Sequence, residues 1–292
     1  MSDTVCAVIV TYNRIDTLKT ALQHILDQNK VPERIIIVDN NSTDGTIDYL
    51  RTLEGHAIVH PMYLPSNVGS AGAIAAAMKE GIKNGKFDYF WILDDDTFYE
   101  KNALNELLDN MHKTDFAMIG LHGAHIKFGR KIMVSDDAPL TQVDYSLIDG
   151  SLIKTEAIEK SGVVDERFFM MCDDHEYSLR LRQNGFKIGV LKNGADNRLY
   201  LGGHGSFTRA TLWRGYYSAR NHMLIIRKYF SIPNLLAYIW MQIKLLTAAA
   251  LFAPDRFKRV RYRLKGIWHG IRGIGGRTLD PGTLEFDMKN RM

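Results

Sequence analysis

The first hundred residues alternate strand-like and helix-like segments, and this alternation limits the fold more than any other feature of the sequence. Short apolar runs rich in β-branched residues predict strands at Val5–Val10, Ile35–Val38 and Ile58–Leu64, and a fourth apolar run ends at Leu93. Apolar residues recur at helical spacing between these runs, including an alanine-rich segment that ends near Lys83. Strands separated by helices predict βαβ units, and therefore a Rossmann-like, mostly parallel sheet flanked by helices.

Polar clusters follow the four predicted strands directly, at Thr11–Arg14, Asp39–Asn41, Asn67–Gly72 and Asp94–Asp96. Because ligands bind at the carboxyl ends of the strands in such sheets, we expect the four clusters to line one crevice. The first cluster contains no glycine, which excludes a dinucleotide site of the dehydrogenase kind, and no Gly-x-x-x-x-Gly-Lys-Ser/Thr sequence is present. The charge of a phosphate must then be met by a metal ion and by side chains.

Three consecutive acids, Asp94, Asp95 and Asp96, end the fourth apolar run. Like charges this close raise one another's pKa, so a bound cation would favour the arrangement. In an extended segment Asp94 and Asp96 would point the same way and could share one ion. Carboxylate oxygens suit Mg²⁺ or Mn²⁺, which commonly accompany diphosphates. The alternative is an acidic turn that caps the next helix through Asp96 or Thr97.

The net charge of +4 is unevenly distributed, because ten Lys or Arg and four Asp or Glu follow residue 253. The basic character therefore belongs to the C-terminal tail, and we expect no nucleic-acid partner for the main domain. Cys6 and Cys172 form no zinc or disulfide pattern, which favours a reducing, cytoplasmic setting. The first residues lack the basic flank and long apolar core of a secretory signal.

The chain changes character from Ile232 onward. Ile232–Ala253 is nearly apolar, but a proline, an asparagine, a glutamine and a lysine make it a poor candidate to span a bilayer. Arg256–Lys265 then interleaves basic residues with aromatic and aliphatic ones. This pattern predicts an interfacial helix attracted to an anionic membrane surface. The alternatives are a helical subdomain with a solvated basic face, or a contact between copies in a homo-oligomer.

Several motifs in order along the chain resemble the inverting, nucleotide-sugar-dependent glycosyltransferases of family 2, which have the GT-A fold. The motifs are Val8–Arg14, Val38–Thr46, Asn67-x-Gly69, Asp94–Asp96, Val164–Met170, Asp173–Arg180 and His204. The later ones look like the branch of galactofuranosyl- and rhamnosyltransferases, and the Asp-Asp-x-Glu-Tyr pattern beside a triple Asp leans toward galactofuranosyl transfer. Ser70 and Ala73 stand where that branch often has glycine.

The resemblance implies a role for individual residues. The donor nucleotide would be bound by Thr11, Tyr12, Arg14, Asp39, Asn67, Gly69 and Asp95. A divalent metal, Mn²⁺ or Mg²⁺, would be held by Asp94, Asp96 and His204. The catalytic base would be Asp174, and the acceptor would be bound by Asp173, Glu176, Tyr216 and Arg220.

The resulting expectation is an inverting transferase at the cytoplasmic face of the cell membrane, peripherally associated with it. It would move galactofuranose from UDP-galactofuranose to a polyprenyl-linked or polysaccharide acceptor. The alternatives are a dTDP-rhamnose donor, or a non-catalytic protein that binds nucleotide sugars during assembly. We expect a GT-A domain over residues 1–230, with a nucleotide-binding half at 1–115 and an acceptor-binding half at 116–230. A C-terminal amphipathic, basic helical region would cover residues 231–292.

Overall fold

The computed structural model describes residues 3–127, 130–134, 139–192, 196–199 and 211–287, and its centre is an eight-stranded mixed sheet. The strands follow the order β3-β2-β1-β4-β11-β6-β12-β9. Their bounds are β1 Val5–Thr11, β2 Arg34–Asp39, β3 Val59–Tyr63, β4 Tyr89–Asp94, β6 Phe116–Gly120, β9 Leu140–Gln142, β11 Ser151–Lys154 and β12 Lys187–Leu191. Strands β1 to β4 are all parallel, and Val8 of β1 pairs with Ile36 on one side and with Ile92 on the other. The predicted parallel sheet is confirmed, and β11 joins it antiparallel to β4 and β6.

Nine α-helices and five shorter strands complete the described residues. The helices are α1 Ile15–Leu26, α2 Thr46–Arg51, α3 Gly69–Asn84, α4 Ala103–Lys113, α5 Thr155–Ser161, α6 Asp173–Gln183, α7 Leu212–Lys228, α8 Ile232–Phe252 and α9 Arg256–Ile271. The short strands are β5 Thr97–Tyr99, β7 Gly123–Lys127, β8 Arg130–Met133, β10 Tyr145–Ser146 and β13 Asp196–Arg198. Strands β10, β7 and β8 form a second sheet, and β5 pairs with β13.

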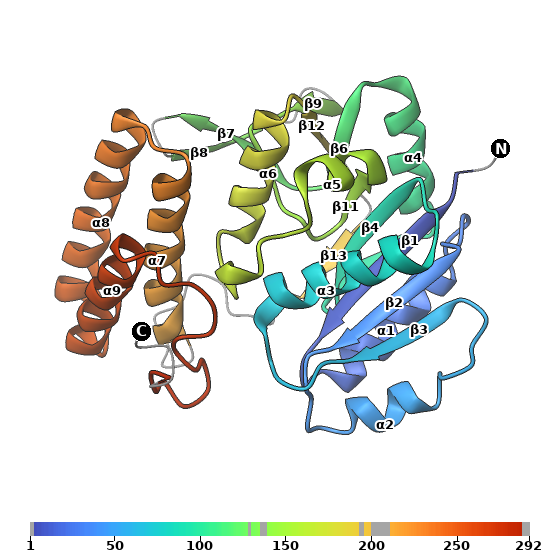
Figure 1. Cartoon of the computed structure of the whole chain (residues 1–292), viewed down its shortest axis with the longest axis horizontal. Helices are drawn as coiled ribbons and strands as arrows, with labels where there is room; N and C mark the ends of the chain where they lie inside the picture. The colour runs from blue at the N-terminus through green and yellow to red at the C-terminus, as the bar shows by residue number, and fades with distance from the viewer. Residues whose placement is uncertain (1–2, 128–129, 135–138, 193–195, 200–210, 288–292) are drawn as a thin grey trace.

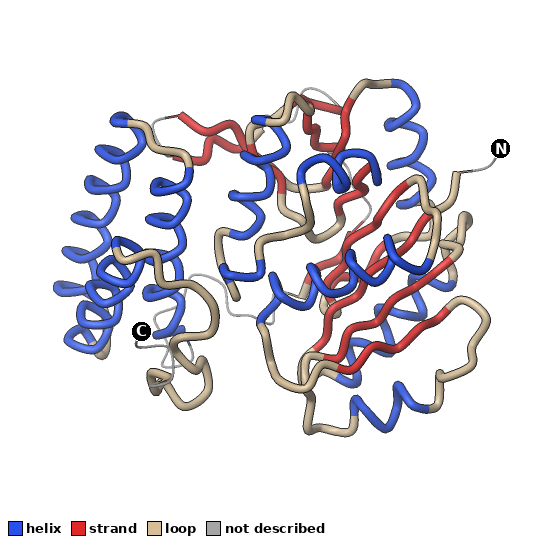
Figure 2. Tube along the Cα trace, in the orientation of Figure 1, coloured by secondary structure: helices blue, strands red, loops and turns tan. Residues whose placement is uncertain are grey.

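Helices cover both faces of the large sheet, as the separation of strands and helices in Figure 2 shows. Alternate residues of each central strand point to opposite faces, so β1 contributes to two cores. Cys6 and Val8 pack with α3 in one core, while Ala7 and Ile9 pack with α1 and α4 in the other. This burial on both faces explains why the strands read as continuous apolar runs.

Helices α7, α8 and α9 form a unit at the end of the molecule away from β1 to β3 (Figure 1). Helix α9 approaches α7 closely at Gly266 and Gly270. A Cβ atom at Gly266 would lie 2.3 Å from the carbonyl oxygen of Tyr216, and one at Gly270 would lie 2.7 Å from that of Arg220. Helices α7 and α9 therefore pack closely against each other across the domain boundary expected at residue 230.

Helix α8 is 21 residues long, with a mean hydropathy of 1.6 over its most apolar window, and by length and composition alone it could cross a membrane. The expectation that Ile232–Ala253 is a poor candidate to span a bilayer is therefore not supported by its hydropathy. Only 17% of that window is buried inside the protein. Most of α8 therefore lies on the surface of the protein.

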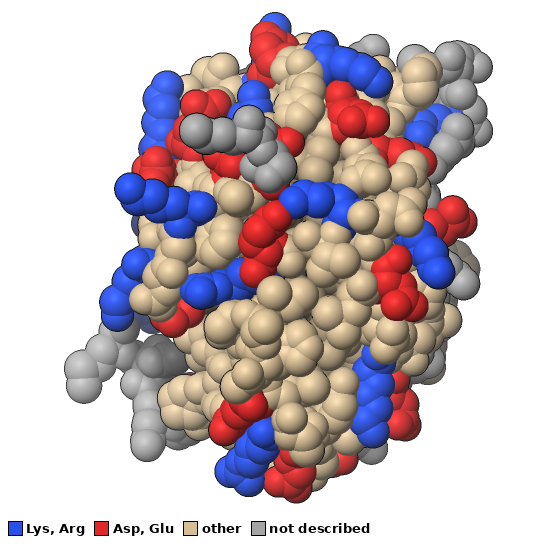
Figure 3. Space-filling view, turned by 90° about the vertical axis from the view of Figure 1, so that its right-hand side faces the viewer, with Lys and Arg blue, Asp and Glu red and all other residues tan. Residues whose placement is uncertain are grey.

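The opposite end of the molecule carries a mixed surface. Figure 3 shows Lys and Arg side chains interspersed with Asp and Glu around a wide uncharged area. A surface of this kind differs from the concentrated positive charge of a nucleic-acid-binding face.

Candidate active site

A cavity of about 1430 Å³ opens at the carboxyl ends of β1, β2 and β4 and extends to α6, α7 and α8. Each of the four polar clusters contributes to its lining, through Thr11, Asn40, Asn67 and Asp94 among others. Ligand pockets commonly measure about 300–1000 Å³, so this cavity has room for a sugar nucleotide together with part of a second substrate. The crevice expected from the sheet topology is therefore present.

The acid triplet sits at the end of β4 in a network with the first polar cluster. The Thr11 hydroxyl donates to Asp95 at 2.7 Å, and Arg14 donates to Asp95 at 2.8 Å and to Asp96 at 3.2 Å. Burial raises the pKa of Asp95, while the Arg14 charge and the Thr11 hydrogen bond oppose that rise. Arg14, expected to bind the donor nucleotide, lines the cavity, and its ion pairs are with Asp95 and Asp96.

Asp149 holds the turn that carries the triplet, and the sequence reading missed it. Its Oδ1 accepts hydrogen bonds from the Asp94 backbone N–H and the Tyr99 hydroxyl, both at 2.8 Å, and its Oδ2 accepts from Thr97 at 2.9 Å. Strand β4 ends at Asp94, and Asp95 and Asp96 form a turn, so the two-residue alternation of an extended segment does not apply to them. The available sequence signal was weak, because Asp149 is a single acid in a loop.

Two of the three expected metal ligands, Asp94 and Asp96, line the cavity. His204 lies outside the residues that the structure describes. Within the described ranges, no three His, Cys, Asp or Glu side chains gather closely enough to hold a metal ion by themselves. Asp94 and Asp96 both line the cavity, and carboxylates are the donor type that suits a Mg²⁺ or Mn²⁺ ion taking its other ligands from a diphosphate and water.

The second polar cluster places Asn40, and not Asp39, at the cavity. Asp39 is fully buried at the end of β2, and its carboxylate accepts a hydrogen bond from the Ser42 backbone N–H at 3.1 Å. Asn40 lines the cavity, and its side-chain oxygen accepts from the Val68 backbone N–H at 2.9 Å. The structure gives Asp39 a role in closing the turn, and direct contact with a nucleobase would require that turn to move.

The third cluster lies at the start of α3, where Asn67 and Gly69 line the cavity. Gly69 starts α3 with a φ of +77°, and a Cβ atom there would lie 2.1 Å from the carbonyl oxygen of Phe169. Asn67 closes the same turn, because its side-chain oxygen accepts from the Gly69 N–H at 2.9 Å. The close approach of Phe169 therefore requires glycine at position 69. Asn67, Gly69 and the exposed Tyr12 all line the cavity.

The acid pair Asp173 and Asp174 opens α6 and lines the cavity. The Tyr145 hydroxyl donates to Oδ2 of Asp174, and the His175 backbone N–H donates to Oδ1 at 2.7 Å. Asp173 is only 8% exposed, and its burial, together with the neighbouring Asp174 charge, raises its pKa to about 7. Tyr145 was not anticipated, since nothing near it in the sequence marks it.

Helix α7 fixes the segment that delivers these acids. Phe169, Met171 and Cys172 all adopt positive φ values, an unfavourable conformation for residues with side chains. Asn221 donates from its amide to the carbonyl oxygens of Phe168 at 2.8 Å, Met170 at 2.8 Å and Met171 at 2.7 Å. These contacts offset the strain and set the start of α6.

Arg220, expected to bind the acceptor, belongs to the same support. It is fully buried and donates to the carbonyl oxygens of Phe168 at 3.0 Å and Gly276 at 2.6 Å. Tyr216 is also fully buried, with its hydroxyl 2.6 Å from that of Thr278. Neither side chain lines the cavity, so the structure does not support direct acceptor contact by either of them.

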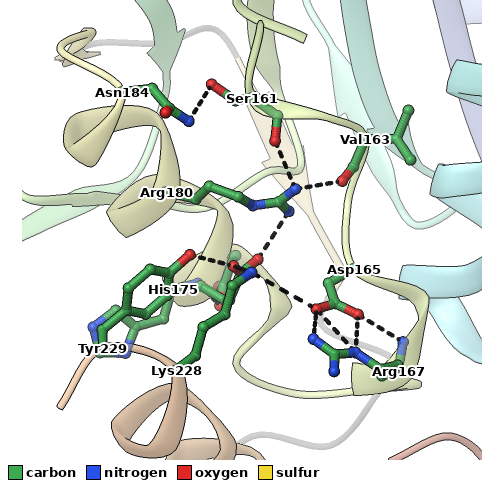
Figure 4. A network of polar contacts seen from close by, with 11 residues as sticks. Ser161, Val163, Asp165, Arg167, His175, Arg180, Asn184, Lys228 and Tyr229 are labelled. Atoms are coloured by element: carbon green, nitrogen blue, oxygen red, sulfur yellow. Dashed lines mark hydrogen bonds and ion pairs between the residues drawn. The ribbon is translucent and has the colours of Figure 1, made fainter. Parts of the chain in front are cut away.

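Glu176 is the third expected acceptor residue that turns away from the cavity. It is fully buried and accepts from Arg180 at 2.9 Å, and from Lys228 and Tyr229 at 2.8 Å each. Figure 4 shows Arg180 of α6 bridging toward Ser161 and Val163, with Lys228 and Tyr229 approaching from the end of α7. This network joins α6 to α7, which accounts for Glu176 without a substrate.

The remaining wall of the cavity is aromatic and basic. His175 and His222 lie against each other with ring centroids 5.8 Å apart, and Lys131 lies over the Tyr145 ring. Burial lowers the pKa of His222 to about 4, with His175 and Lys131 contributing. Both imidazoles are therefore neutral near pH 7, because burial also lowers the pKa of His175.

Comparisons with known proteins agree with this geometry. Residues 6–143 match the family model described as glycosyl transferase family 2. Galactofuranosyltransferase GlfT1 of Mycolicibacterium smegmatis is 26% identical over 65% of this chain and 68% of its own. The dTDP-rhamnosyl transferase RfbF of Shigella flexneri is 24% identical over 94% of this chain and 98% of its own.

The fold has solved counterparts as well. The mannosyltransferase PcManGT from Pyrobaculum calidifontis, in complex with GDP-Man and Mn²⁺, superposes with a TM-score of 0.57 at 14% identity, over 91% of this chain and 86% of its own. At 14% identity this structural similarity supports the fold alone, and the activity is supported by the family model. The protein is therefore a nucleotide-sugar-dependent glycosyltransferase that carries a family 2 domain on a GT-A fold.

Proposed function

We propose that this glycosyltransferase moves galactofuranose from UDP-galactofuranose, with inversion at the anomeric carbon, to a lipid-linked or polysaccharide acceptor in cell-surface glycan synthesis. The observation that carries the proposal is that the acid triplet and the pair Asp173–Asp174 line one cavity, although they lie far apart in the sequence. One set of carboxylates is suited to the donor diphosphate and the other to the acceptor. The galactofuranosyl donor is supported by the Asp-Asp-x-Glu-Tyr pattern and by the GlfT1 relatives.

In this proposal Asp174 is the general base. Its carboxylate takes the proton of the acceptor hydroxyl as that oxygen bonds to the anomeric carbon, while the bond from this carbon to the donor diphosphate breaks on the opposite face. The hydrogen bonds from Tyr145 and the His175 backbone hold the carboxylate in one orientation. Asp173 lies next to it on the cavity wall, where it is placed to orient the acceptor.

Asp94 and Asp96 would hold a divalent ion, with His204 as the expected third protein ligand. When bound, such an ion supplies positive charge to the departing diphosphate. Arg14 forms ion pairs with Asp95 and Asp96 and so holds these two members of the triplet in place. The presence of Mn²⁺ and a sugar nucleotide in the PcManGT complex favours this choice of ion.

A donor panel tests the proposal. The purified protein is incubated with Mn²⁺ and UDP-galactofuranose, dTDP-rhamnose or UDP-GlcNAc, and release of nucleoside diphosphate is measured with and without a glycan acceptor. We expect the fastest release from UDP-galactofuranose, a further increase with acceptor, and loss on chelation. Asp174→Asn should still bind UDP while transfer falls about 100-fold or more, as for loss of a general base. Near wild-type turnover by this variant would show that Asp174 is not the base.

The second candidate donor is dTDP-rhamnose. It is favoured by one observation, the match to RfbF over nearly the full length of both chains. Release of dTDP but not UDP in the same panel would select it.

We also propose that the protein works at the cytoplasmic face of the cell membrane, as a peripherally bound enzyme. The support is the apolar and basic character of α8 and α9.

A further inference from the structure

The outward faces of α8 and α9 expose large apolar side chains. They are Leu236, Ile239, Trp240 and Ile243 on α8, and Phe257, Leu264 and Trp268 on α9. The members lie three or four residues apart on α8 and seven and four residues apart on α9, so on each helix they lie along one side. Phe257 is 81% exposed and Trp240 is 57% exposed, so these two helices together expose a large apolar surface of the kind that marks an interaction site.

Positive charge accompanies this apolar surface. Helix α9 contains six Lys or Arg and no Asp or Glu, and α8 contains one lysine and no acid. Lys258 and Arg261 are exposed on α9, and the Arg272 guanidinium lies 5.9 Å from the ring centroid of Trp268. Apolar side chains next to the exposed Lys258 and Arg261 match the interfacial region of an anionic bilayer.

The opposite side of α8 packs against the protein through its three buried residues, Tyr238, Gln242 and Ala249. Tyr238 donates to the carbonyl oxygen of Ala219 at 3.0 Å, and Gln242 accepts from Arg263 of α9 at 2.9 Å. A spanning helix would have to break these buried contacts and expose their polar atoms to lipid. Helix α8 therefore suits a position parallel to a membrane surface.

The same helix also forms a wall of the active-site cavity, through Met241 and Lys244. Lys244 lies one helical turn after Trp240 and next to Ile243, so the cavity wall borders the exposed apolar face directly. Lys244 is itself exposed, and among the described residues no carboxylate pairs with it. If Trp240 lay in the headgroup region of a bilayer, the part of the cavity that Lys244 lines would lie at the same depth.

We infer that the outward faces of α8 and α9 seat the protein on an anionic lipid bilayer, with the cavity opening at the bilayer surface between α6 and α8. This orientation rests on the proposed function and extends it, because a lipid-anchored acceptor would then enter the cavity from the membrane plane past Lys244. A second copy of the chain is a poorer occupant. Symmetric pairing of this surface would bring together two α9 helices that each carry six basic residues and no acid, with Asp255 as the one acid directly before each helix.

The experiment uses the full chain and vesicles of phosphatidylcholine with or without phosphatidylglycerol. Trp240 and Trp268 are exposed, whereas Trp91 and Trp213 are buried, so intrinsic fluorescence reports on this surface. We expect co-sedimentation with the anionic vesicles, a blue shift of the emission, and quenching by brominated lipid. Added salt should weaken binding ~10-fold or more, because each basic residue near an anionic surface contributes about 1 kcal/mol.

Matched variants give the controls. Trp240→Glu with Trp268→Glu should abolish vesicle binding, while Trp240→Phe with Trp268→Phe should keep the binding and lose the blue shift. Thermal unfolding of each variant checks that it is folded. No binding to anionic vesicles, binding that resists salt as a spanning helix would, or a concentration-dependent dimer broken by Trp240→Glu would each overturn the inference. Vesicle binding needs no donor, so a negative donor panel would refute the proposed function and leave this result standing.

Discussion

Tyr145 of β10 donates a hydrogen bond from its hydroxyl to the carboxylate of Asp174 at the start of α6. Burial raises the pKa of the Tyr145 phenol, and the neighbouring Asp174 charge raises it further, so the hydroxyl keeps its proton at physiological pH. With the His175 backbone N–H on the other oxygen, both oxygens of the carboxylate are held. The small sheet of β10, β7 and β8 thus helps to orient the proposed base.

Tyr145→Phe tests this arrangement. The variant keeps the ring that packs against Lys131 and His175, and removes only the donor to Asp174. We expect kcat to fall about tenfold, with the KM for the donor unchanged, because one charge-assisted hydrogen bond that orients the base is lost. Steady-state kinetics with varied donor checks it. An unchanged kcat would show that the base needs no such orientation.

The parallel half of the sheet could be predicted from the sequence because its signals are local. Apolar runs and helical spacing appear within a few residues of each other, and the topology then brings Thr11, Asn67 and Asp94 to the same edge. The acid triplet and the acid pair are likewise contiguous in the sequence. The place of the acid triplet in the crevice follows from the fold class, whereas the place of the acid pair was implied only by the family resemblance.

The direction in which the other side chains point could not be predicted. Glu176 follows Asp173 and Asp174 within one helical turn, yet it faces Lys228, which lies 52 residues further along the chain. Arg220 was expected at the acceptor and instead supports the loop before α6. Both assignments depend on the packing of α7 against α6 and α9, and no local pattern encodes it. Asp149 and Tyr145 could not be predicted either, because each contacts residues 29 or more positions away in the sequence, Asp149 the turn after β4 and Tyr145 the start of α6.

Glu176→Gln separates a structural role from acceptor binding. The carboxylate lies buried between Arg180 and Lys228, and removing one partner of a buried ion pair typically costs about 3–5 kcal/mol. We expect a loss of unfolding free energy in that range, measured by urea denaturation, with little change in the KM for acceptor at a temperature where the variant is folded. The control is Glu166→Gln, whose partner Lys79 forms an exposed pair, and exposed pairs contribute about 0–1 kcal/mol. A raised KM for the acceptor with an unchanged unfolding free energy would show instead that Glu176 binds the acceptor.

Asp173 should make stability depend on pH. Burial, and then the charges of Asp174 and Glu176, raises its pKa to about 7 in the folded protein, above its ordinary value of 3.8. The folded state therefore binds more protons than the unfolded state between these values, and the unfolding free energy falls as pH rises from about 4 to about 7.

In Asp173→Asn that contribution is absent. The stability of the variant relative to wild type should increase across this pH range, by at most about 4 kcal/mol, since one pKa unit corresponds to about 1.4 kcal/mol. Urea denaturation of both proteins over a pH series measures the difference. A difference that does not change with pH would mean that Asp173 is charged throughout.

Gly69→Ala tests the contact between the start of α3 and the loop that precedes the acid pair. The added Cβ would lie 2.1 Å from the Phe169 carbonyl oxygen, in a residue whose φ is +77°. Gly55→Ala is the matched control, because Gly55 has a φ of +83° and no neighbouring atom within 4 Å of the added Cβ. The unfolding free energy of Gly55→Ala should fall only by the cost of placing alanine in a left-handed conformation, about 1–2 kcal/mol. Gly69→Ala should lose more, and kcat should fall as well, because Phe169 would be displaced in the segment that positions Asp174. Urea denaturation and steady-state kinetics on both variants give the comparison, and equal losses of stability with unchanged kcat would mean that the loop accommodates the methyl group without moving the acids.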